Sequence, residues 1–167
     1  ERENRWKLYS NILENYSNLC HQILISEKNT NAIEYLKERG LTKKEIINFK
    51  IGYAPQDNNF YRILKEKFNE AQINSAGIFY YDEKKSIQVD RFKDRIIFPV
   101  KNLSNITIAL GARTISNSKY AKYINSSETE FFKKGNNLYN INNAKQLNSI
   151  TQEVFIVEGY MDVISLH

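Results

Sequence analysis

The sequence predicts an α+β fold in which N-terminal helices precede a small mixed or antiparallel sheet, and a last strand leads into the start of a helix. Three observations predict this order. Apolar residues recur at helical spacing through most of the first 76 residues, short β-rich runs follow, and a final apolar run ends in an acidic residue and a glycine. We therefore divide the chain into residues 1–149, helical over 1–76 with a sheet and a basic loop over 77–149, and residues 150–167, the start of an α/β unit.

Each expected helix is bounded by recognisable signals. The helices are Arg5–Ile25, Asn31–Arg39, a short helix through Phe49 that begins at the capping box Thr42-Lys43-Lys44-Glu45, and Phe60–Phe68. Gly40 closes the second helix, because glycine tolerates the left-handed position that ends many helices. Pro55 and the polar run 56–59 break the helical pattern before the fourth.

The sheet is expected from three short runs rich in β-branched and aromatic residues, at 78–81, 95–100 and 106–111. Residues 117–142 show little apolar periodicity and are expected to form a long polar loop. A loop of this length in a compact domain indicates a function. Residues 143–147 are expected to form a short helix.

The last part begins with the apolar run 152–157, which is typical of a buried parallel strand, and helical spacing resumes over 160–167. Glu158 is the most informative acid of the chain, because ligands in open α/β sheets bind at the carboxyl ends of strands. Gly159 lets a backbone or a phosphate approach closely. The alternative is that Glu158 only caps the helix that follows.

Length and composition exclude several classes of protein. A chain of 167 residues with 41% hydrophobic residues allows one domain, or one and a fragment, and is unlike a disordered chain. No stretch approaches the 18 or so apolar residues of a membrane span, and both ends look cut from something longer. Cys20 is the only cysteine, so neither an intrachain disulfide nor a cysteine-based zinc site can form, and a reducing compartment fits best. His21 and His167 have no partner at metal-ligand spacing.

The positive charge is concentrated in one third of the chain. The net charge is +5, but the segment from Lys84 to Lys134 holds eleven Lys and Arg against four Asp and Glu, which gives +7. The remainder holds thirteen against fifteen, which gives −2. A basic segment in a near-neutral protein suggests a polyanionic partner, because phosphate contacts release counterions. The alternative is an ordinary solvated surface.

An ordered series of motifs resembles one protein family. The segment from Val157 to Val163, with its Glu-Gly-Tyr-Met-Asp core, is similar to the first motif of the Toprim domain and resembles the bacterial replicative DNA primases. Upstream blocks resemble the same family in its order and spacing: Tyr35–Leu41, Phe49–Pro55, Asp90–Val100, Gly111–Arg113, Lys122–Thr129 and Phe132–Tyr139. Ser127 stands where the family usually has Pro, and Ala112 where it usually has Gly.

The resemblance implies that residues 1–149 are the N-terminal lobe of a primase RNA-polymerase core and that residues 150–167 begin a truncated Toprim domain. The candidates for binding template and nucleotides are Arg91, Lys93, Arg95, Arg113, Lys122, Asn125 and Lys134. Arg91, Lys93 and Arg95 alternate, which on a strand would place all three on one face. Tyr123 is either a base-stacking residue or a packed aromatic.

The resemblance also implies a catalytic role for Glu158, as a general base or an organiser of Mg²⁺ or Mn²⁺, with Gly159 and Asp162 structural. One carboxylate is too few for such a metal site, so we expect the isolated segment to make no primers. The full enzyme would copy single-stranded DNA with nucleoside triphosphates in the bacterial cytoplasm, associated with the nucleoid during replication. It would carry zinc in a separate N-terminal domain and bind the replicative helicase through a C-terminal domain.

Two alternatives stay open. A non-catalytic single-stranded nucleic-acid-binding module would share the basic segment. Another Toprim enzyme, a nuclease or a topoisomerase, would share Glu158.

Overall fold

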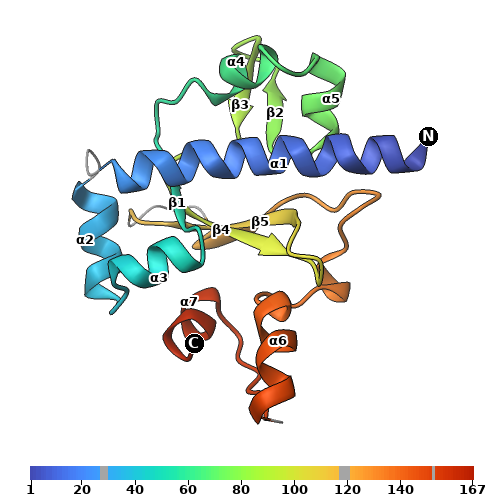
Figure 1. The fold of residues 1–167 in the computed structure, drawn as a ribbon. Helices are drawn as coiled ribbons and strands as arrows, with labels where there is room; N and C mark the ends of the chain where they lie inside the picture. The colour runs from blue at the N-terminus through green and yellow to red at the C-terminus, as the bar shows by residue number, and fades with distance from the viewer. Residues whose placement is uncertain (27–29, 117–120, 152) are drawn as a thin grey trace.

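The computed structural model describes residues 1–26, 30–116, 121–151 and 153–167. Its elements are, in order, α1 Arg2–Ile25, α2 Thr30–Glu38, α3 Lys43–Asn48, β1 Gly52–Ala54, α4 Phe60–Lys65, α5 Glu70–Ser75, β2 Phe79–Asp82, β3 Ile87–Asp90, β4 Arg95–Lys101, β5 Thr107–Thr114, β6 Tyr123–Asn125, the 3-10 helix η1 Lys134–Asn136, α6 Ile141–Thr151 and α7 Tyr160–Ser165 (Figure 1). Within the described part of the chain, no helix is long and apolar enough to cross a membrane.

The long helix α1 is the centre of the molecule. The hairpin of β2 and β3 lies on one side of it with α4 and α5, and the four-stranded sheet lies on the other (Figure 1). Because α1 is covered on both sides, it buries apolar residues around much of its circumference, among them Leu13 and Tyr16. The Tyr16 hydroxyl donates to the buried Asp90 carboxylate over 2.8 Å and so joins α1 to β3.

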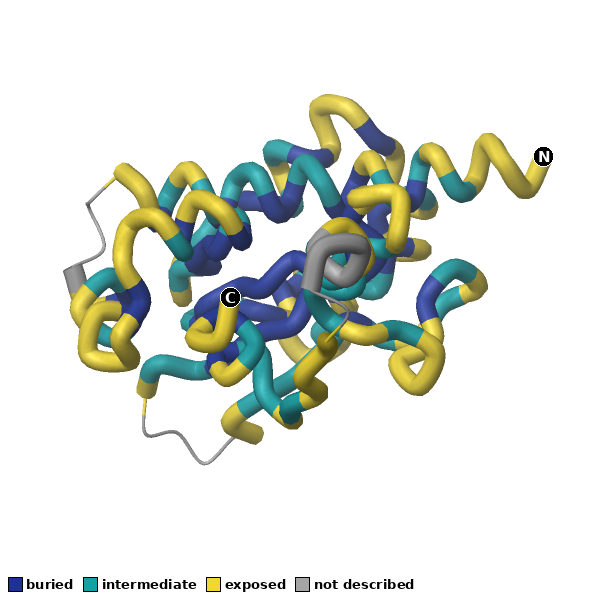
Figure 2. Tube along the Cα trace, turned by 60° about the horizontal axis from the view of Figure 1, so that its bottom comes forward, coloured by how far each residue is buried: buried dark blue, intermediate teal, exposed yellow. Residues whose placement is uncertain are grey.

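The sheet has the strand order β1-β4-β5-β6, and every neighbouring pair is antiparallel. Its two long strands, β4 and β5, are buried on both faces (Figure 2). The register aligns Ile97 with Ala112 and Ile124, a row that packs in the same core as α1. The adjacent row aligns Phe98 with Gly111 and Asn125 and therefore points to the opposite face.

The structure confirms the α+β class and most expected helices. The predicted capping box forms at the start of α3, where Oγ1 of Thr42 accepts from the Lys44 N–H and the Glu45 carboxylate accepts from the Thr42 N–H. The N-terminal part is not helical throughout, since β1 interrupts it and pairs with β4. The helix expected over Phe60–Phe68 is shorter, and α5 follows it with a second capping box, in which Asn69 and Gln72 exchange hydrogen bonds.

The structure contains two further short strands, β3 and β6, that the sequence did not predict. Strand β3 completes the hairpin with β2, and β6 lies inside the segment expected to be a long loop. Residues 117–120 of that segment lie outside the described residues. Helix α6 is longer than the helix expected over 143–147.

The strand expected over 152–157 is not formed. Residues 153–157 have no regular structure, and Gln152 lies outside the described residues. Val154, Phe155 and Ile156 are 58%, 80% and 82% exposed. A strand needs a neighbour for its backbone hydrogen bonds, and no strand in the described ranges pairs with this segment. The helix start after Gly159 does form, as α7.

Candidate nucleic-acid interface

Three arginines meet at the edge strand β6. Arg91 donates from Nε to the Asn125 carbonyl over 3.4 Å, and Arg95 donates from Nη1 to the Lys122 carbonyl over 3.3 Å. Arg113 donates from Nη1 to the Tyr123 hydroxyl. We call Arg91, Arg95 and Arg113 the β6 arginine cluster. It forms because the antiparallel register brings β5 beside β6 and the turn before β4 beside the end of β6.

The expected stripe of alternating cations on one strand is wrong. Residues 91–94 form a turn between β3 and β4, and Asp94 adopts a left-handed φ of 57°. The Tyr53 hydroxyl donates to this Asp94 carboxylate over 2.9 Å. Arg91 is consequently exposed, Lys93 is half-buried and Arg95 is buried at the start of β4, so the alternation along a strand does not exist.

The cluster surrounds β6 instead of lying on one face of the sheet. Arg95 aligns with Ala54 and Thr114, in the row next to Ile96, while Arg113 aligns with Ile96 itself. Side chains of adjacent rows point to opposite faces. The guanidinium groups therefore approach the edge strand from both sides.

Arg113 is held between two tyrosine rings. Its guanidinium carbon lies 5.0 Å from the centre of the Tyr123 ring and 5.4 Å from the centre of the Tyr35 ring, distances suited to cation–π attraction. The side chain is only 5% exposed, yet Nε has no hydrogen-bond partner, and neither has the hydroxyl of Tyr35. A buried cation with an unsatisfied donor is costly, unless an anion completes its contacts.

Of the other predicted cations, only Lys122 adjoins the cluster, because its carbonyl accepts from Arg95. Lys122 is exposed immediately before β6. Lys134 is exposed on η1, where its backbone N–H donates to Glu128 over 3.2 Å. Lys93 acts electrostatically on Asp90. The structure thus brings three predicted arginines, Lys122 and Asn125 together, and does not bring Lys93 or Lys134 into contact with them.

Tyr160 attaches the Glu158-Gly159 turn to this region. Its ring stacks on Phe98 at 5.2 Å with the planes 3° apart, and its hydroxyl donates to Oδ1 of Asn125. A Cβ added at Gly111 would overlap the Tyr160 ring, so the glycine makes the space that the ring fills. Burial raises the pKa of Tyr160 to about 12, which keeps the hydroxyl protonated at neutral pH.

The two acids near Gly159, Glu158 and Asp162, have different surroundings. The Asp162 carboxylate accepts from the Gly159 N–H over 3.2 Å and caps the first turn of α7. Glu158 is exposed two residues before Tyr160. Across the residues that the structure describes, no three His, Cys, Asp or Glu side chains are grouped so that they could hold a metal ion. Glu158 and Asp162 alone do not fit Mg²⁺ or Mn²⁺, which need several oxygen ligands.

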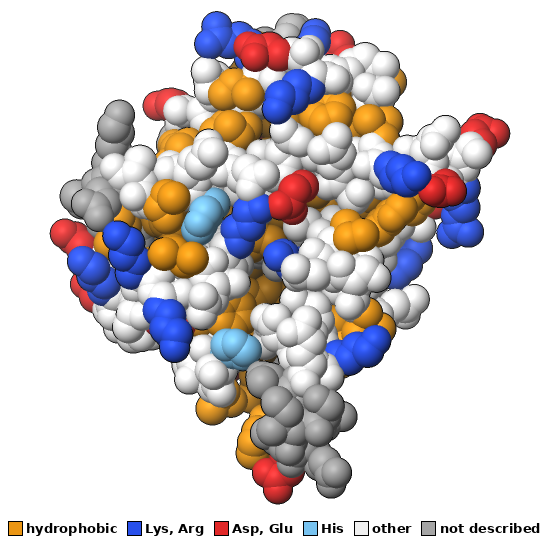
Figure 3. All heavy atoms as spheres, viewed as in Figure 1, with side chains coloured by type: hydrophobic (Ala, Val, Ile, Leu, Met, Phe, Trp, Pro, Cys, Tyr) orange, Lys and Arg blue, Asp and Glu red, His pale blue; other side chains and the backbone are white. Residues whose placement is uncertain are grey.

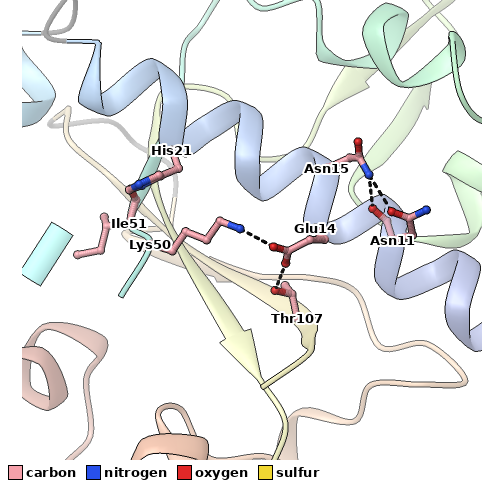
Figure 4. A network of polar contacts seen from close by, with 7 residues as sticks. All are labelled: Asn11, Glu14, Asn15, His21, Lys50, Ile51 and Thr107. Carbon is pink, nitrogen blue, oxygen red and sulfur yellow. Dashed lines mark hydrogen bonds and ion pairs between the residues drawn. The ribbon is translucent and has the colours of Figure 1, made fainter. Parts of the chain in front are cut away.

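A second polar network lies on the other side of the sheet (Figure 4). Glu14 of α1 accepts from Lys50 and, over 2.6 Å, from the Thr107 hydroxyl, and these contacts lower the pKa of Glu14 although burial alone would raise it. His21 contacts the Ile51 carbonyl through Nδ1 over 2.6 Å. These bonds join α1 to the segments around it. On the face of the molecule seen in Figure 3, cations lie singly or in small groups among acidic and neutral residues.

Sequence reasoning missed two residues of the interface. Tyr35 belongs to α2 and reaches Arg113 only through the tertiary fold. Tyr160 was noted as part of a motif, but its bond to Asn125 crosses 35 positions of the chain. Gly111 was the one available signal, because a glycine inside a strand indicates a close approach by another group.

The family described as the N-terminal domain of the DNA primase catalytic core matches residues 19–145. This match covers more than half of the chain, and the chain belongs to that family. The DNA primase of Clostridium acetobutylicum is 41% identical over 143 residues, which are 84% of this chain and 23% of that protein.

Solved primase structures share the fold. The zinc-binding and RNA polymerase domains of the Aquifex aeolicus primase superimpose with a TM-score of 0.89 at 30% identity, over 97% of this chain and 40% of that one. A DnaG primase catalytic domain bound to single-stranded DNA gives a TM-score of 0.87 at 31% identity, over 98% of this chain and 51% of that one. The chain thus spans about a quarter of the curated relative and about half of this catalytic domain.

Proposed function

We propose that this chain supplies a template- and nucleotide-binding surface to an enzyme that synthesises short RNA primers on single-stranded DNA. The β6 arginine cluster carries the proposal, because three guanidinium groups converge on one edge strand. None of the three forms an ion pair with a carboxylate of the described residues. Unpaired cations at one place attract the phosphates of a nucleic-acid strand. Membership of the primase family supports the same reading.

The cluster offers both surface and buried charge. Arg91 and Lys122 are exposed and suited to direct phosphate contacts. Arg113 contributes its charge from below the surface, where salt screens it less than an exposed charge. Burial lowers the pKa of Arg95, but an arginine stays protonated at any physiological pH. Tyr123, beside Arg113, presents an aromatic ring on which a base can stack.

Glu158 has the catalytic role in this proposal, as the first carboxylate of a Toprim domain that begins at residue 150. Its support is position: Tyr160, two residues on, contacts Asn125 of β6. A site for Mg²⁺ or Mn²⁺ needs further acids besides those described. Nucleoside triphosphates as substrates, a replicative helicase as partner, zinc in a separate domain and a cytoplasmic, nucleoid-associated location belong to the same proposal for the whole protein.

A second candidate is a non-catalytic binding module for single-stranded nucleic acid. The lack of a metal-binding group among the described residues favours it for this chain taken alone. Both candidates predict that the 167-residue chain makes no primers with Mg²⁺ and nucleoside triphosphates. They differ when the chain is placed in a longer primase, because there only the catalytic role makes Glu158→Gln abolish primer synthesis. A Toprim nuclease or topoisomerase is disfavoured, since the family matched is that of primases.

Fluorescence anisotropy with labelled single-stranded DNA tests the binding surface. We expect the logarithm of the association constant to fall linearly with the logarithm of salt concentration. The slope should be about −2.8 if the three arginines of the cluster and Lys122 each neutralise one phosphate, at roughly −0.7 per phosphate. Binding that does not change with salt, or no binding at low salt, would contradict the proposal.

A further inference from the structure

Asn125 is held on one side only. Its carbonyl accepts from Arg91, and its side-chain Oδ1 accepts from the Tyr160 hydroxyl. The side-chain NH₂ group has no hydrogen-bond partner among the residues that the structure describes, and the residue is half-buried. One end of the amide is thus fixed by the protein, and the other end is open.

Packing holds the Tyr160 ring in place. The Tyr160 ring lies flat on Phe98, meets the Tyr139 ring edge-on at 4.8 Å and occupies the space above Gly111. Three contacts therefore determine where the hydroxyl lies. The Tyr160 hydroxyl donates to Oδ1 of Asn125, so the NH₂ group of the same amide lies on the side away from Tyr160.

We infer that Tyr160 is a positioning residue, which holds the Asn125 amide with its NH₂ group directed to the ligand. Without the Tyr160 hydroxyl, an asparagine amide offers either a donor or an acceptor, depending on its rotation. With it, Asn125 directs its NH₂ donor away from Tyr160. The group that it binds is therefore an acceptor oxygen or nitrogen, such as a phosphate oxygen, a sugar oxygen or a pyrimidine carbonyl. This inference rests on the proposed function and adds the chemistry of one contact.

The arrangement also connects Glu158 to the ligand surface. Glu158 and Tyr160 are two residues apart, and Asp162 caps the turn between them. A ligand held by Asn125 then lies at a set position relative to the Glu158 turn. The same tyrosine orients the donor and anchors the turn.

A double-mutant cycle on single-stranded DNA binding tests the inference. In the 167-residue chain, Asn125→Ala removes the donor, and we expect about 3- to 10-fold weaker binding. Tyr160→Phe keeps the ring stacking and removes the hydroxyl, so we expect about threefold weaker binding because the amide can rotate. If Tyr160 acts through Asn125, the double variant binds no more weakly than Asn125→Ala. Multiplication of the two losses in the double variant would overturn the positioning role.

The variant Asn125→Asp tests whether the side-chain NH₂ group of Asn125 meets a hydrogen-bond acceptor of the ligand. It retains an acceptor for Tyr160 but replaces the outward donor with a negative oxygen. We expect weaker binding than for Asn125→Ala, because the new charge faces acceptor groups. Binding equal to or tighter than that of Asn125→Ala would show that no acceptor meets this position.

Tyr139→Phe is the matched control. Its ring also packs against Tyr160, but its buried hydroxyl has no hydrogen-bond partner, so we expect no change in DNA binding. Equal unfolding temperatures for Tyr139→Phe and Tyr160→Phe show that any loss of binding is not a loss of fold. If the wild-type chain binds DNA with the expected salt slope and Tyr160→Phe has no effect, this inference fails while the proposed function stands. If the wild-type chain does not bind, the proposed function itself fails.

Discussion

The two faces of the four-stranded sheet are covered in different ways. A 24-residue helix, α1, covers one face, where Ile97 and Ala112 are fully buried in an apolar core. On the other face, Phe98 packs in a second apolar core with residues of α2, α3 and α7, and the Tyr160 ring lies over Gly111.

This difference explains where a ligand surface is available. The helix packs apolar side chains along the whole row beneath it and fixes the sheet. On the second face, polar residues lie beside the Tyr160 ring: Arg113 has an unsatisfied Nε, and the side-chain NH₂ group of Asn125 has no partner among the described residues. Both faces stabilise the fold, and Arg113 and Asn125 lie on the second face, while Arg95 joins the β6 arginine cluster from the first.

Replacing one glycine by alanine on each face should affect stability differently, and this is the largest effect that we expect. A Cβ at Gly52 would lie 2.6 Å from Cys20 Cβ and 2.7–2.8 Å from the α1 backbone, which cannot move away. We expect Gly52→Ala to lower the free energy of unfolding by about 3 kcal/mol or more. A Cβ at Gly111 meets the Tyr160 ring, and the short helix α7 that carries this ring can shift more easily than the backbone of α1, so Gly111→Ala should cost less, about 1 kcal/mol.

Urea unfolding measures both values, with Gly135→Ala as the control, because a Cβ there meets nothing within 4 Å. Equal losses for Gly52→Ala and Gly111→Ala would show that α7 is packed as rigidly as α1.

The second prediction concerns a buried carboxylate, Asp90, which joins the β2–β3 hairpin to α1. Asp90 accepts from the Tyr16 hydroxyl, from Asn58 over 3.0 Å and from the Phe92 N–H over 2.7 Å. Burial nevertheless raises the pKa of Asp90 to about 6. Between pH 4 and 6 the unfolded chain releases this proton while the folded chain keeps it. Stability from this group is therefore full below about pH 4 and declines as the pH rises to about 6, by about 3 kcal/mol.

Chemical denaturation at several pH values measures this slope. Asp90→Asn should flatten it between pH 4 and 6, whereas removal of an exposed carboxylate in Asp57→Asn should leave it unchanged. The slope is compared, and not the absolute stability, because the new amide NH₂ would face donors. An unchanged slope in Asp90→Asn would mean that other groups cause the pH dependence.

Sequence reasoning reached the helices more fully than the short strands. Helical spacing located α1, and the capping box Thr42 to Glu45 located α3, because these signals are local. Strands β1 and β6 have three residues each and exist only because β4 and β5 lie beside them. A local pattern cannot reveal such strands.

The same limit applies to the interface. Spacing by two placed Arg91 and Arg95 on one strand, but the positive φ of Asp94 makes a turn there. Register alone decides that Arg95 and Arg113 leave opposite faces of the sheet. The resemblance to primases nevertheless selected residues that the fold gathers around β6, although it did not reveal Tyr35 or the contact of Tyr160.

The smallest expected effect tests whether position or total charge draws the ligand. Lys122 and Lys84 are both exposed and belong to the same basic segment, but Lys84 lies in the β2–β3 hairpin on the far side of α1 (Figure 1). We expect Lys122→Ala to weaken single-stranded DNA binding by about 1 kcal/mol and to make the salt slope shallower by about 0.7, because one phosphate contact is lost. Lys84→Ala removes the same charge away from β6 and should change neither value by more than a few tenths. Anisotropy titrations of the two variants at matched salt decide the matter. Equal losses would mean that the DNA responds to the net charge of the molecule. The β6 arginine cluster and its surroundings would then have no special role in binding.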